Sequence, residues 1–511
     1  MSRPAASLRV AVVGGGLGGI SAAVHLAARG HRVTLYERTG MLGGKASIFE
    51  QAGYSFDTGP SLLTMPETLD ELCTAAGLDR AAELPLARLD PQCRYFFPDG
   101  QKLDLRDDRA STLRQVAAFS PGQDRSFATA LDLSESIYET VGRPFLEAPF
   151  EGMTRMARAF AGKPFAALRF GAMQGFLADV SKGASSDERL QWIIQRYATY
   201  AGGGPARTPA AFAMILHLET AGGAWYPQGG IHSIARMGGR LLEHVGVEVK
   251  LNTPVQSLVV RNGAARAVVT KGVEAPYDAI VANADPVTVA RQLLSREAVE
   301  QSGLTPHLDQ ELGLSGAVLL LGMKGRLDHL SHHTVVFPQR YPDEFTDLFK
   351  HGRTPRDPTV YLCVPSRTDP GRAPPGCESV FCMINSPAFR DGDGPDLTPV
   401  QFTSLIKRAV ERVIPDLTSR IEVEHFIGPA ELQSRFQAPG GSIYGVSPHG
   451  RLSPFHRPMQ RAEGLRGLYF AGGGTNPGGG IPLVLRSGLF AADLVERDLG
   501  RGRLSAPGAA L

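Results

Sequence analysis

The N-terminal part of the chain has two short apolar runs, separated by a glycine cluster and an alanine-rich stretch typical of a helix. This pattern predicts a buried strand from Leu8 to Val13, a turn from Gly14 to Gly19, a helix from Ile20 to Arg29 and a second strand from His31 to Glu37. A strand–helix–strand unit of about 30 residues has a right-handed crossover, so its strands lie parallel in one sheet with the helix over one face.

The same kinds of strand and helix pattern return in the middle and at the end of the chain. Residues 229–272 indicate a helix, a strand around Val247 to Leu251 and a hairpin across the sequence Arg-Asn-Gly. Residues 277–285 form another apolar run, and residues 467–499 indicate a strand, a glycine-rich turn and a helix. We therefore expect one nucleotide-binding domain that is assembled from separated segments.

The segments between these α/β patterns have a different character, with mostly helical patterns first and strands between proline-rich loops later. A chain of 511 residues is also too long for one ordinary core, which favours two or three domains. The prediction is an α/β fold with a discontinuous nucleotide-binding domain (1–74, 225–300 and 455–511), a mainly helical region that faces substrate and membrane (75–224) and a strand-rich α+β substrate domain (301–454).

Composition excludes some classes of partner and site. The 53 basic and 51 acidic residues leave a net charge of +2, which gives no general electrostatic case for binding nucleic acid. The five cysteines form no CxxC pair, so no metal site is predicted and reduced thiols in a cytosolic protein are favoured. Apolar segments such as residues 315–323 are well short of the ~20 residues that span a bilayer. We therefore expect no transmembrane helix.

The glycine cluster has the spacing of a phosphate-binding turn. Gly14, Gly16 and Gly19 fit the pattern GxGxxG between a strand and a helix, which is the context that this motif requires. Gly14 permits the tight turn, Gly16 lets the backbone approach a pyrophosphate, and Gly19 allows the helix to pack closely on the strand. The helix N-terminus favours the phosphates, and Glu37 can accept hydrogen bonds from ribose hydroxyls. These features predict a dinucleotide but do not separate NAD from FAD.

Two further glycines, Gly43 and Gly44, follow Glu37. This pattern resembles the two-dinucleotide-binding signature of flavoproteins, in which paired glycines help to cover FAD, and it favours a Rossmann-like FAD-binding domain. The whole chain resembles the bacterial carotenoid desaturases of the phytoene-desaturase type, which are FAD-dependent and related to amine oxidases. The resemblance rests on the N-terminal glycine motif and on further motifs at residues 56–66, 225–235, 357–376, 438–448 and 467–488.

The resemblance implies which residues hold FAD. Those around its ADP part are Gly14, Gly16, Leu17, Gly18, Gly19, Glu37, Arg38, Gly43, Gly44 and Lys45, with Val255 at the adenine. Those that approach the pyrophosphate, ribitol and flavin from the C-terminal motif are Gly473, Gly474, Gly480 and Ile481. The family usually has histidine where this chain has Asn476, and residues 482–488 differ from the commoner phytoene-desaturase ending, which leaves the reaction step open. No cysteine follows Cys382, so non-covalent FAD is expected.

The implied reaction introduces C=C bonds into an acyclic carotenoid. The flavin takes a hydride and a proton is lost, while an apolar channel must hold a hydrocarbon that offers no hydrogen-bonding group. The candidates for a base are Asp57, His232 and Asp285, each of which also has a structural interpretation. No second GxGxxG motif indicates a nicotinamide site, so oxygen or a quinone is the implied electron acceptor.

Two pairs of neighbouring residues could belong to the site or to the core. His332 and His333 could suggest a metal, but adjacent residues in a strand point to opposite faces, so we expect a structural or surface role for them. Trp225 and Tyr226 could flank the flavin or the substrate, and ordinary core packing is an equally good interpretation.

A carotenoid lives in the bilayer, so a membrane-facing entry is also implied. Residues 154–183 combine a single acid, Asp179, with apolar residues and five basic ones: Arg155, Arg158, Lys163, Arg169 and Lys182. This pattern is typical of an interfacial helix on anionic lipid, although a helical hairpin packed on its own domain fits equally well. The expected location is cytoplasmic and peripheral, on the inner face of the cell membrane.

Several reactions remain open at this point. Within the resemblance, the C-terminal ending favours 3,4-desaturation of a 1-hydroxycarotenoid, and desaturation of phytoene or ζ-carotene is the alternative. A soluble flavin amine oxidase is an alternative from another class, and so is a carotenoid isomerase or carrier that performs no net oxidation.

Overall fold

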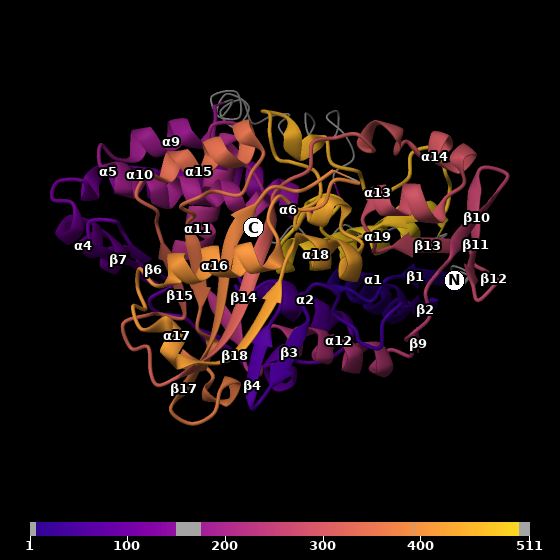
Figure 1. The fold of residues 1–511 in the computed structure, drawn as a ribbon. Helices are drawn as coiled ribbons and strands as arrows, with labels where there is room; N and C mark the ends of the chain where they lie inside the picture. Colours follow the sequence, from indigo (N-terminus) through magenta and orange to yellow (C-terminus); the bar gives the residue numbers. More distant parts are fainter. Residues whose placement is uncertain (1–6, 150–174, 391, 500–511) are drawn as a thin grey trace.

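The computed structural model of the protein describes residues 7–149, 175–390 and 392–499. One of its two large sheets has five strands (Figure 1). The strands follow the order β19-β13-β1-β2-β9, and all neighbours run parallel. They come from the beginning, middle and end of the chain, as the separated patterns predict. Their bounds are β1 (Arg9–Val13), β2 (Arg32–Tyr36), β9 (Glu248–Lys250), β13 (Ala279–Ala282) and β19 (Leu468–Phe470).

Strand β1 lies at the centre of this sheet, and its apolar run is buried. Val10 pairs with Val33 of β2 on one side and with Ala279 of β13 on the other. Both faces of a parallel sheet are covered, which is why these strands are nearly continuous runs of Val, Ile, Leu and Ala. Because the strands are parallel, the turns that follow β1, β13 and β19 meet at one edge, where such sheets bind their ligands.

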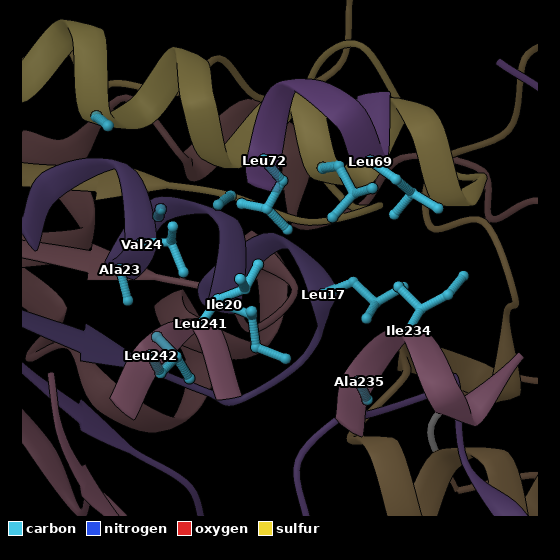
Figure 2. Packing of buried hydrophobic residues seen from close by; sticks show 14 of the residues in the cluster. Leu17, Ile20, Ala23, Val24, Leu69, Leu72, Ile234, Ala235, Leu241 and Leu242 are labelled. Atoms are coloured by element: carbon cyan, nitrogen blue, oxygen red, sulfur yellow. The ribbon is translucent and has the colours of Figure 1, made fainter. Parts of the chain in front are cut away.

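Four helices cover this sheet, and their leucines form the core beside it. Figure 2 shows side chains of α1, among them Leu17 and Ile20, together with Leu72 of α2 and Leu241 of α12. α1 also crosses α19 closely, because a Cβ at Gly488 would lie 2.3 Å from the carbonyl oxygen of Gly18. The bounds are α1 (Leu17–Ala28), α2 (Glu67–Ala75), α12 (His232–His244) and α19 (Ile481–Leu499).

Three small antiparallel sheets accompany the two large ones in the described residues: β10-β11-β12, β3-β4 and β5-β8. The hairpin predicted at Arg-Asn-Gly joins β10 to β11, and both turn residues have positive φ, 51° at Asn262 and 66° at Gly263. β3 pairs with β4, and β5 pairs with β8. The bounds are β3 (Ile48–Gln51), β4 (Tyr54–Asp57), β5 (Leu86–Arg88), β8 (Trp225–Pro227), β10 (Ser257–Arg261), β11 (Ala264–Thr270) and β12 (Val273–Pro276).

A second large sheet has seven strands in the order β18-β14-β17-β16-β15-β6-β7. Its neighbours are antiparallel except β15 and β6, which run parallel. The bounds are β6 (Cys93–Phe96), β7 (Lys102–Leu105), β14 (Ser315–Lys324), β15 (His333–Val336), β16 (Val360–Cys363), β17 (Cys377–Ser386) and β18 (Ile421–Ile427).

Two strands of this sheet come from the region 75–224, which was predicted to be mainly helical. β6 and β7 form a hairpin around the turn Asp99-Gly100, where Gly100 has a φ of 81°. Alternating apolar and polar residues on both sides of an Asp-Gly pair are a hairpin signal, and this local signal outweighs the helical character of the surrounding sequence. The sheet that borders the site therefore crosses the predicted domain boundaries.

One face of the seven-stranded sheet is covered by helix α16 (Pro399–Val410), which packs on alternate residues of β14, β16 and β17. Thr398 caps this helix, accepting a hydrogen bond from the backbone N–H of Gln401 at 3.3 Å. The region 301–454 thus contains helices as well as the predicted strands and proline-rich loops. Besides α16, this region contains the helices α15 (Tyr341–Thr346), α17 (Leu417–Arg420) and α18 (Pro429–Phe436). The helix α14 (Arg296–Ser302) crosses its N-terminal boundary.

A group of helices packs beside β6 and β15, at the upper left of Figure 1. Their bounds are α4 (Arg109–Phe119), α5 (Asp124–Ile137), α9 (Leu177–Ala184), α10 (Glu188–Gln195) and α11 (Met214–Thr220). The short helix α6 (Arg143–Leu146) lies nearer the centre of the view. Most of the predicted interfacial segment 154–183 lies outside the described residues. Its described end, α9, packs against α5 and α10 with Leu177 and Ser181 buried. In the part of the chain that the structure describes, no helix is long and apolar enough to cross a bilayer.

Candidate functional site

A large cavity of about 1100 Å³ lies between the two large sheets. One end is lined by the turns that follow β1, β2 and β13, and the other by one face of the seven-stranded sheet and by α11. Most of its lining is apolar. A cavity of this size and length can hold an extended ligand together with a dinucleotide.

The first glycine turn lines one end of the cavity, where a dinucleotide is predicted to bind. Gly14 has a φ of 105°, which an L side chain rarely adopts, so the tight turn requires glycine here. Helix α1 begins at Leu17, inside the motif and three residues earlier than predicted, with Gly16 as its N-cap. A Cβ at Gly19 would lie 2.1 Å from the carbonyl oxygen of Gly14, so Gly19 permits the close packing of helix on strand. Gly18 and Gly19 do not line the cavity, and both contribute through packing.

Glu37, at the end of β2, is buried and lines the cavity. Its Oε2 accepts a hydrogen bond from the backbone N–H of Gly15 at 2.7 Å. Its Oε1 accepts hydrogen bonds from the backbone N–H and the hydroxyl of Thr39, both at 2.8 Å. Three donors hold the carboxylate in one orientation, and the remaining lone pair of Oε2 can accept a hydrogen bond from a ribose hydroxyl.

The paired glycines fold back against the first turn. The backbone N–H of Gly43 donates to the carbonyl of Gly15 at 2.8 Å, and Gly43 pairs with Gly16 as an isolated bridge. Gly44 has a φ of 57°, and a Cβ on it would lie 3.2 Å from Cα of Gly16. The two turns therefore form a narrow cradle made of backbone, which side chains would fill.

The C-terminal glycine loop closes the cradle from the other side. Gly480 has a φ of 113°, and α19 begins directly after it at Ile481, so the N-terminus of a long helix borders the cavity. Asn476 is buried behind this loop, where its side-chain amide donates to the carbonyl of Arg457 at 3.2 Å. The predicted cofactor residues that line the cavity are Gly14, Gly16, Leu17, Glu37, Arg38, Gly43, Gly44, Lys45, Val255, Gly473, Gly474, Gly480 and Ile481.

Three ionisable groups line the cavity, the buried Arg457 and the partly buried Lys45 and Asp285. Burial lowers the pKa of Lys45 to about 8, and its ammonium group donates to the carbonyl of Ile443 at 2.7 Å. Burial also raises the pKa of Asp285, whose Oδ1 caps a short helix, α13 (Pro286–Thr288), by accepting from the N–H of Val287. Burial lowers the pKa of Arg457 to about 10. Sequence reasoning missed Arg457, since a single arginine in a proline-rich stretch carries no motif.

Of the three candidate bases, Asp285 alone lines the cavity among the described residues. Asp57 accepts a hydrogen bond from the hydroxyl of Tyr226 at 2.8 Å and lies 3.4 Å from the guanidinium of Arg372, so it neutralises a buried cation. Nδ1 of His232 donates to the carbonyl of Ala46 at 2.9 Å, which holds the segment after the paired glycines. Trp225 and Tyr226 do not line the cavity either, which favours the core-packing interpretation.

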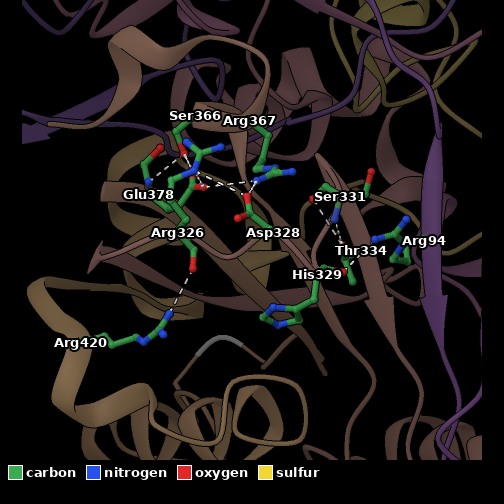
Figure 3. A network of polar contacts seen from close by, with 11 residues as sticks. Arg94, Arg326, Asp328, His329, Ser331, Thr334, Ser366, Arg367, Glu378 and Arg420 are labelled. Atoms are coloured by element: carbon green, nitrogen blue, oxygen red, sulfur yellow. Dashed lines mark hydrogen bonds and ion pairs between the residues drawn. The ribbon is translucent and has the colours of Figure 1, made fainter. Parts of the chain in front are cut away.

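The prediction that His332 and His333 point to opposite faces is wrong. Their rings lie 4.5 Å apart and both are buried, because His332 precedes β15 and does not follow the alternation of the strand. Polar contacts fix the loop before them (Figure 3): Arg94 donates to the carbonyl of His329 at 2.8 Å, and Asp328 pairs with Arg367.

Cys363 lies beside the two histidines, and one ligand atom from each of the three residues falls within 4.8 Å of the others. Nδ1 of His332 lies 2.7 Å from the hydroxyl of Thr368, and Nδ1 of His333 lies 2.7 Å from that of Tyr361. Burial lowers the pKa of His333 to about 3 and that of His332 well below its usual value, so both are neutral. The Tyr361 hydroxyl that contacts His333 also lies 2.7 Å from the hydroxyl of Ser61, so it links the histidine to the loop that carries this serine.

The end of the cavity away from the glycine turns has a floor made by one row of residues across the seven-stranded sheet. Val318 of β14, Met383 of β17, Tyr361 of β16 and Val335 of β15 are neighbours in register, and all four line the cavity. Three strand intervals of about 4.8 Å give this floor a length of about 14 Å. Side chains from α11 and the turn before it, including Phe212, face it.

Comparison with known proteins adds a family and relatives to this geometry. The family described as flavin containing amine oxidoreductase matches residues 17–496. Hydroxyneurosporene desaturase of Rhodobacter capsulatus is 35% identical over 96% of this chain and 98% of its own length. For 1-hydroxycarotenoid 3,4-desaturase of Flavobacterium sp. (strain P99-3) the identity is 30%, over 95% of this chain and 98% of that protein. 4,4'-Diapolycopene oxygenase of Methylomonas sp is 32% identical over 96% of this chain and 98% of its own length.

A solved structure has the same fold over nearly the whole chain. An oxidoreductase from Methanosarcina mazei superposes with a TM-score of 0.63 at 16% identity, covering 95% of this chain and 100% of the other. At this identity the likeness concerns the fold, which is that of amine-oxidase-like flavoproteins with mixed α/β content.

Proposed function

The chain belongs to the flavin-containing amine oxidoreductases and, within them, to the bacterial carotenoid desaturases, and from this premise we propose that it desaturates an acyclic carotenoid with FAD as the hydride acceptor. It is thus a flavin-dependent oxidoreductase that acts on CH–CH bonds. The observation that carries the proposal is the single cavity that joins a backbone cradle for a dinucleotide to a long apolar floor. A hydrocarbon must be oriented by shape, and such a floor provides shape without hydrogen bonds.

The residues of the cradle fit FAD. Glu37 retains an acceptor position for a ribose hydroxyl, and the N-termini of α1 and α19 both border the cavity where a pyrophosphate would need partial positive charge. None of the cysteines in the described residues lines the cavity, and we propose that FAD is held without a covalent bond. When bound, FAD supplies the oxidising group for hydride transfer.

The protein's own groups position the substrate and exclude water. Val318, Met383 and Val335 form an apolar surface on which a polyene can lie, and Phe381 closes it from the neighbouring pleat. A base must accept the proton that leaves the neighbouring carbon, and Asp285 is the candidate that borders the cavity. Its raised pKa favours proton uptake at Oδ2, since Oδ1 accepts from the N–H of Val287.

The proposed reaction is 3,4-desaturation of a 1-hydroxycarotenoid. It is supported by the C-terminal ending of the chain and by full-length similarity to desaturases that are named for hydroxylated carotenoids. Desaturation of phytoene or ζ-carotene is the alternative, and relatives of that kind are also similar, such as a lycopene-forming phytoene desaturase at 30% identity. We further propose oxygen or a quinone as electron acceptor, and the inner face of the cell membrane as the source of substrate.

The test uses the purified full-length protein with FAD and liposomes that contain one acyclic carotenoid at a time. Desaturation lengthens the conjugated system, so absorption shifts to the red, and a shift with 1-hydroxylated carotenoids and not with phytoene supports 3,4-desaturation. Binding of the polyene without reduction of FAD under anaerobic conditions would instead identify a carrier or isomerase. If primary amines reduce the flavin and no carotenoid does, the protein is an amine oxidase and the proposal fails.

A further inference from the structure

A buried polar cluster ends the apolar floor on the side away from the glycine cradle. The row that starts at Val318 continues beyond Val335 to Tyr95 on β6. The cradle lies at the β14 end of this row, because Lys45 bonds to the carbonyl of Ile443 and the Ile443 side chain packs beside β14. At the β6 end the hydroxyl of Tyr95 accepts a hydrogen bond from Arg196 at 2.7 Å.

Arg196 and its partners form a compact network. Its Nη1 donates to the hydroxyl of Tyr200 at 2.7 Å, and its Nη2 lies 3.7 Å from the carboxylate of Glu219. Glu219 in turn accepts hydrogen bonds from the hydroxyls of Tyr200 at 2.9 Å and of Tyr197 at 2.8 Å. Glu219 therefore neutralises Arg196, and the tyrosine rings around the guanidinium hold it in place.

Hydrogen-bonding capacity remains in this network. A guanidinium has five N–H donors, and Arg196 uses two of them in hydrogen bonds, while its Nε is buried without a partner in the described residues. The oxygen of Tyr200 donates one hydrogen bond and accepts one, which leaves one acceptor position. Arg196 and Tyr200 both line the cavity, whereas Tyr95, Tyr197 and Glu219 do not.

We propose that Arg196 and Tyr200 bind the terminal hydroxyl of an acyclic carotenoid and thereby select hydroxylated over hydrocarbon substrates. A hydroxyl group fits both residues, because its oxygen can accept a hydrogen bond from the guanidinium of Arg196 and its hydrogen can be donated to the oxygen of Tyr200. A hydrocarbon end offers no partner to either group and leaves both without a hydrogen bond from the substrate, which disfavours it. An anionic end group fits less well, since Glu219 already balances the charge of Arg196.

The anchored oxygen would also fix how far the polyene extends along the floor. The bond presented for desaturation then stays a constant number of carbons from the hydroxyl, so one product is formed instead of a series. This inference rests on the proposed function, because it concerns the substrate of the same cavity.

The test compares two tyrosines that donate to the same carboxylate. Tyr200→Phe and Tyr197→Phe each remove one hydrogen bond to Glu219, but only Tyr200 lines the cavity. The measurement is kcat/KM in liposomes for a 1-hydroxylated carotenoid and for the hydrocarbon with the same conjugated length. We expect Tyr200→Phe to lower the ratio of kcat/KM for the hydroxylated substrate to kcat/KM for the hydrocarbon roughly three- to tenfold, through a higher KM for the hydroxylated substrate. Tyr197→Phe should leave this ratio unchanged.

Arg196→Lys gives a second comparison, because it keeps the charge opposite Glu219 and removes the fork of donors; the ratio should fall here too. FAD content and melting temperature identify any variant that has not folded, and Tyr200→Phe should match Tyr197→Phe in both. Equal changes of the ratio in both tyrosine variants, or no change in either, would overturn the inference. A wild-type protein that desaturates no carotenoid refutes the proposed function, whereas one that desaturates both substrates equally refutes only the selection of the hydroxyl.

Discussion

Glutamine at position 37 should weaken FAD binding and destabilise the protein without FAD. The carboxylate accepts from the N–H of Gly15 at 2.7 Å and from the N–H and hydroxyl of Thr39 at 2.8 Å. In Glu37→Gln one of the two terminal atoms becomes an NH₂ group. Whichever way the amide turns, one backbone N–H then faces a donor: either the buried N–H of Gly15 or the partly buried N–H of Thr39. The hydroxyl of Thr39 can rotate to accept, but a backbone N–H cannot.

The size of the effect follows from these contacts. An unpaired buried donor costs about 1–3 kcal/mol, so the free energy of unfolding of the FAD-free protein should fall by up to that amount, and by less if the amide turns its NH₂ toward the partly buried N–H of Thr39. The ribose hydroxyl would lose a charged acceptor, a contribution of about 1.5–3 kcal/mol, so the Kd for FAD should rise roughly 10- to 150-fold.

Flavin fluorescence titration and denaturant unfolding measure the two quantities separately. Glu50→Gln is the matched control, since Glu50 is an exposed residue of β3 away from the cavity, and it should change neither. Glu37→Arg places a cation where the N–H donors converge and should abolish FAD binding. If Glu37→Gln binds FAD as tightly as the wild type, the assignment of this carboxylate to the ribose is wrong.

Three further predictions concern packing, pH and the cavity. Gly488→Ala should lower the free energy of unfolding by about 1–3 kcal/mol, because the new Cβ meets the backbone of Gly18. Gly183→Ala, in open space within α9, is the control and should be neutral or stabilising, so equal effects of the two substitutions on the melting curve would contradict the close crossing of α1 and α19. The pKa of His333 in the folded protein, about 3, lies below its value in the unfolded chain, so its contribution to stability is full above pH 6.5 and falls at lower pH. Between pH 7 and 5 the free energy of unfolding should therefore change less steeply with pH in His333→Phe than in the wild type, by up to about 1.4 kcal/mol per pH unit. An unchanged slope would show that His333 is protonated when folded. Val335→Trp should fill the floor and abolish carotenoid turnover while the bound flavin spectrum stays the same, and normal turnover would place the substrate elsewhere.

The nucleotide-binding half of the fold was predictable because its signals are local. The turn at Gly14 and the hairpin at Asn262-Gly263 depend on a few neighbouring residues whose backbone angles favour glycine or asparagine. The helix boundary at Leu17 was misplaced because the first turn of α1 is made from the glycines that carry the motif. The packing role of Gly19 was predicted from the motif, whereas that of Gly18, which was predicted to lie around the ADP part of FAD, is seen only where α1 crosses α19.

The substrate half depends on contacts that are distant in sequence. The network around Arg196 joins β6, the turn after α10 and α11, and no spacing in the sequence indicates that these segments meet. The geometry of His332 and His333 depends on the loop that the contacts of Arg94 and Arg367 hold in place. The alternation rule failed there because it applies inside a strand and not at the residue before it.

The five-stranded sheet has a consequence for how the protein is made. β1 pairs with β13 about 270 residues later, and β19 and α19 complete the layer only at the end of the described chain. Such contacts have a high cost of loop closure, so the sheet forms late and after most of the chain has left the ribosome. Until β13 and β9 have been made, the outer edges of β1 and β2 have no partner strand in this sheet. The turn after β19 forms part of the cradle for the proposed FAD, so we expect the cofactor to bind only once this last strand is in place.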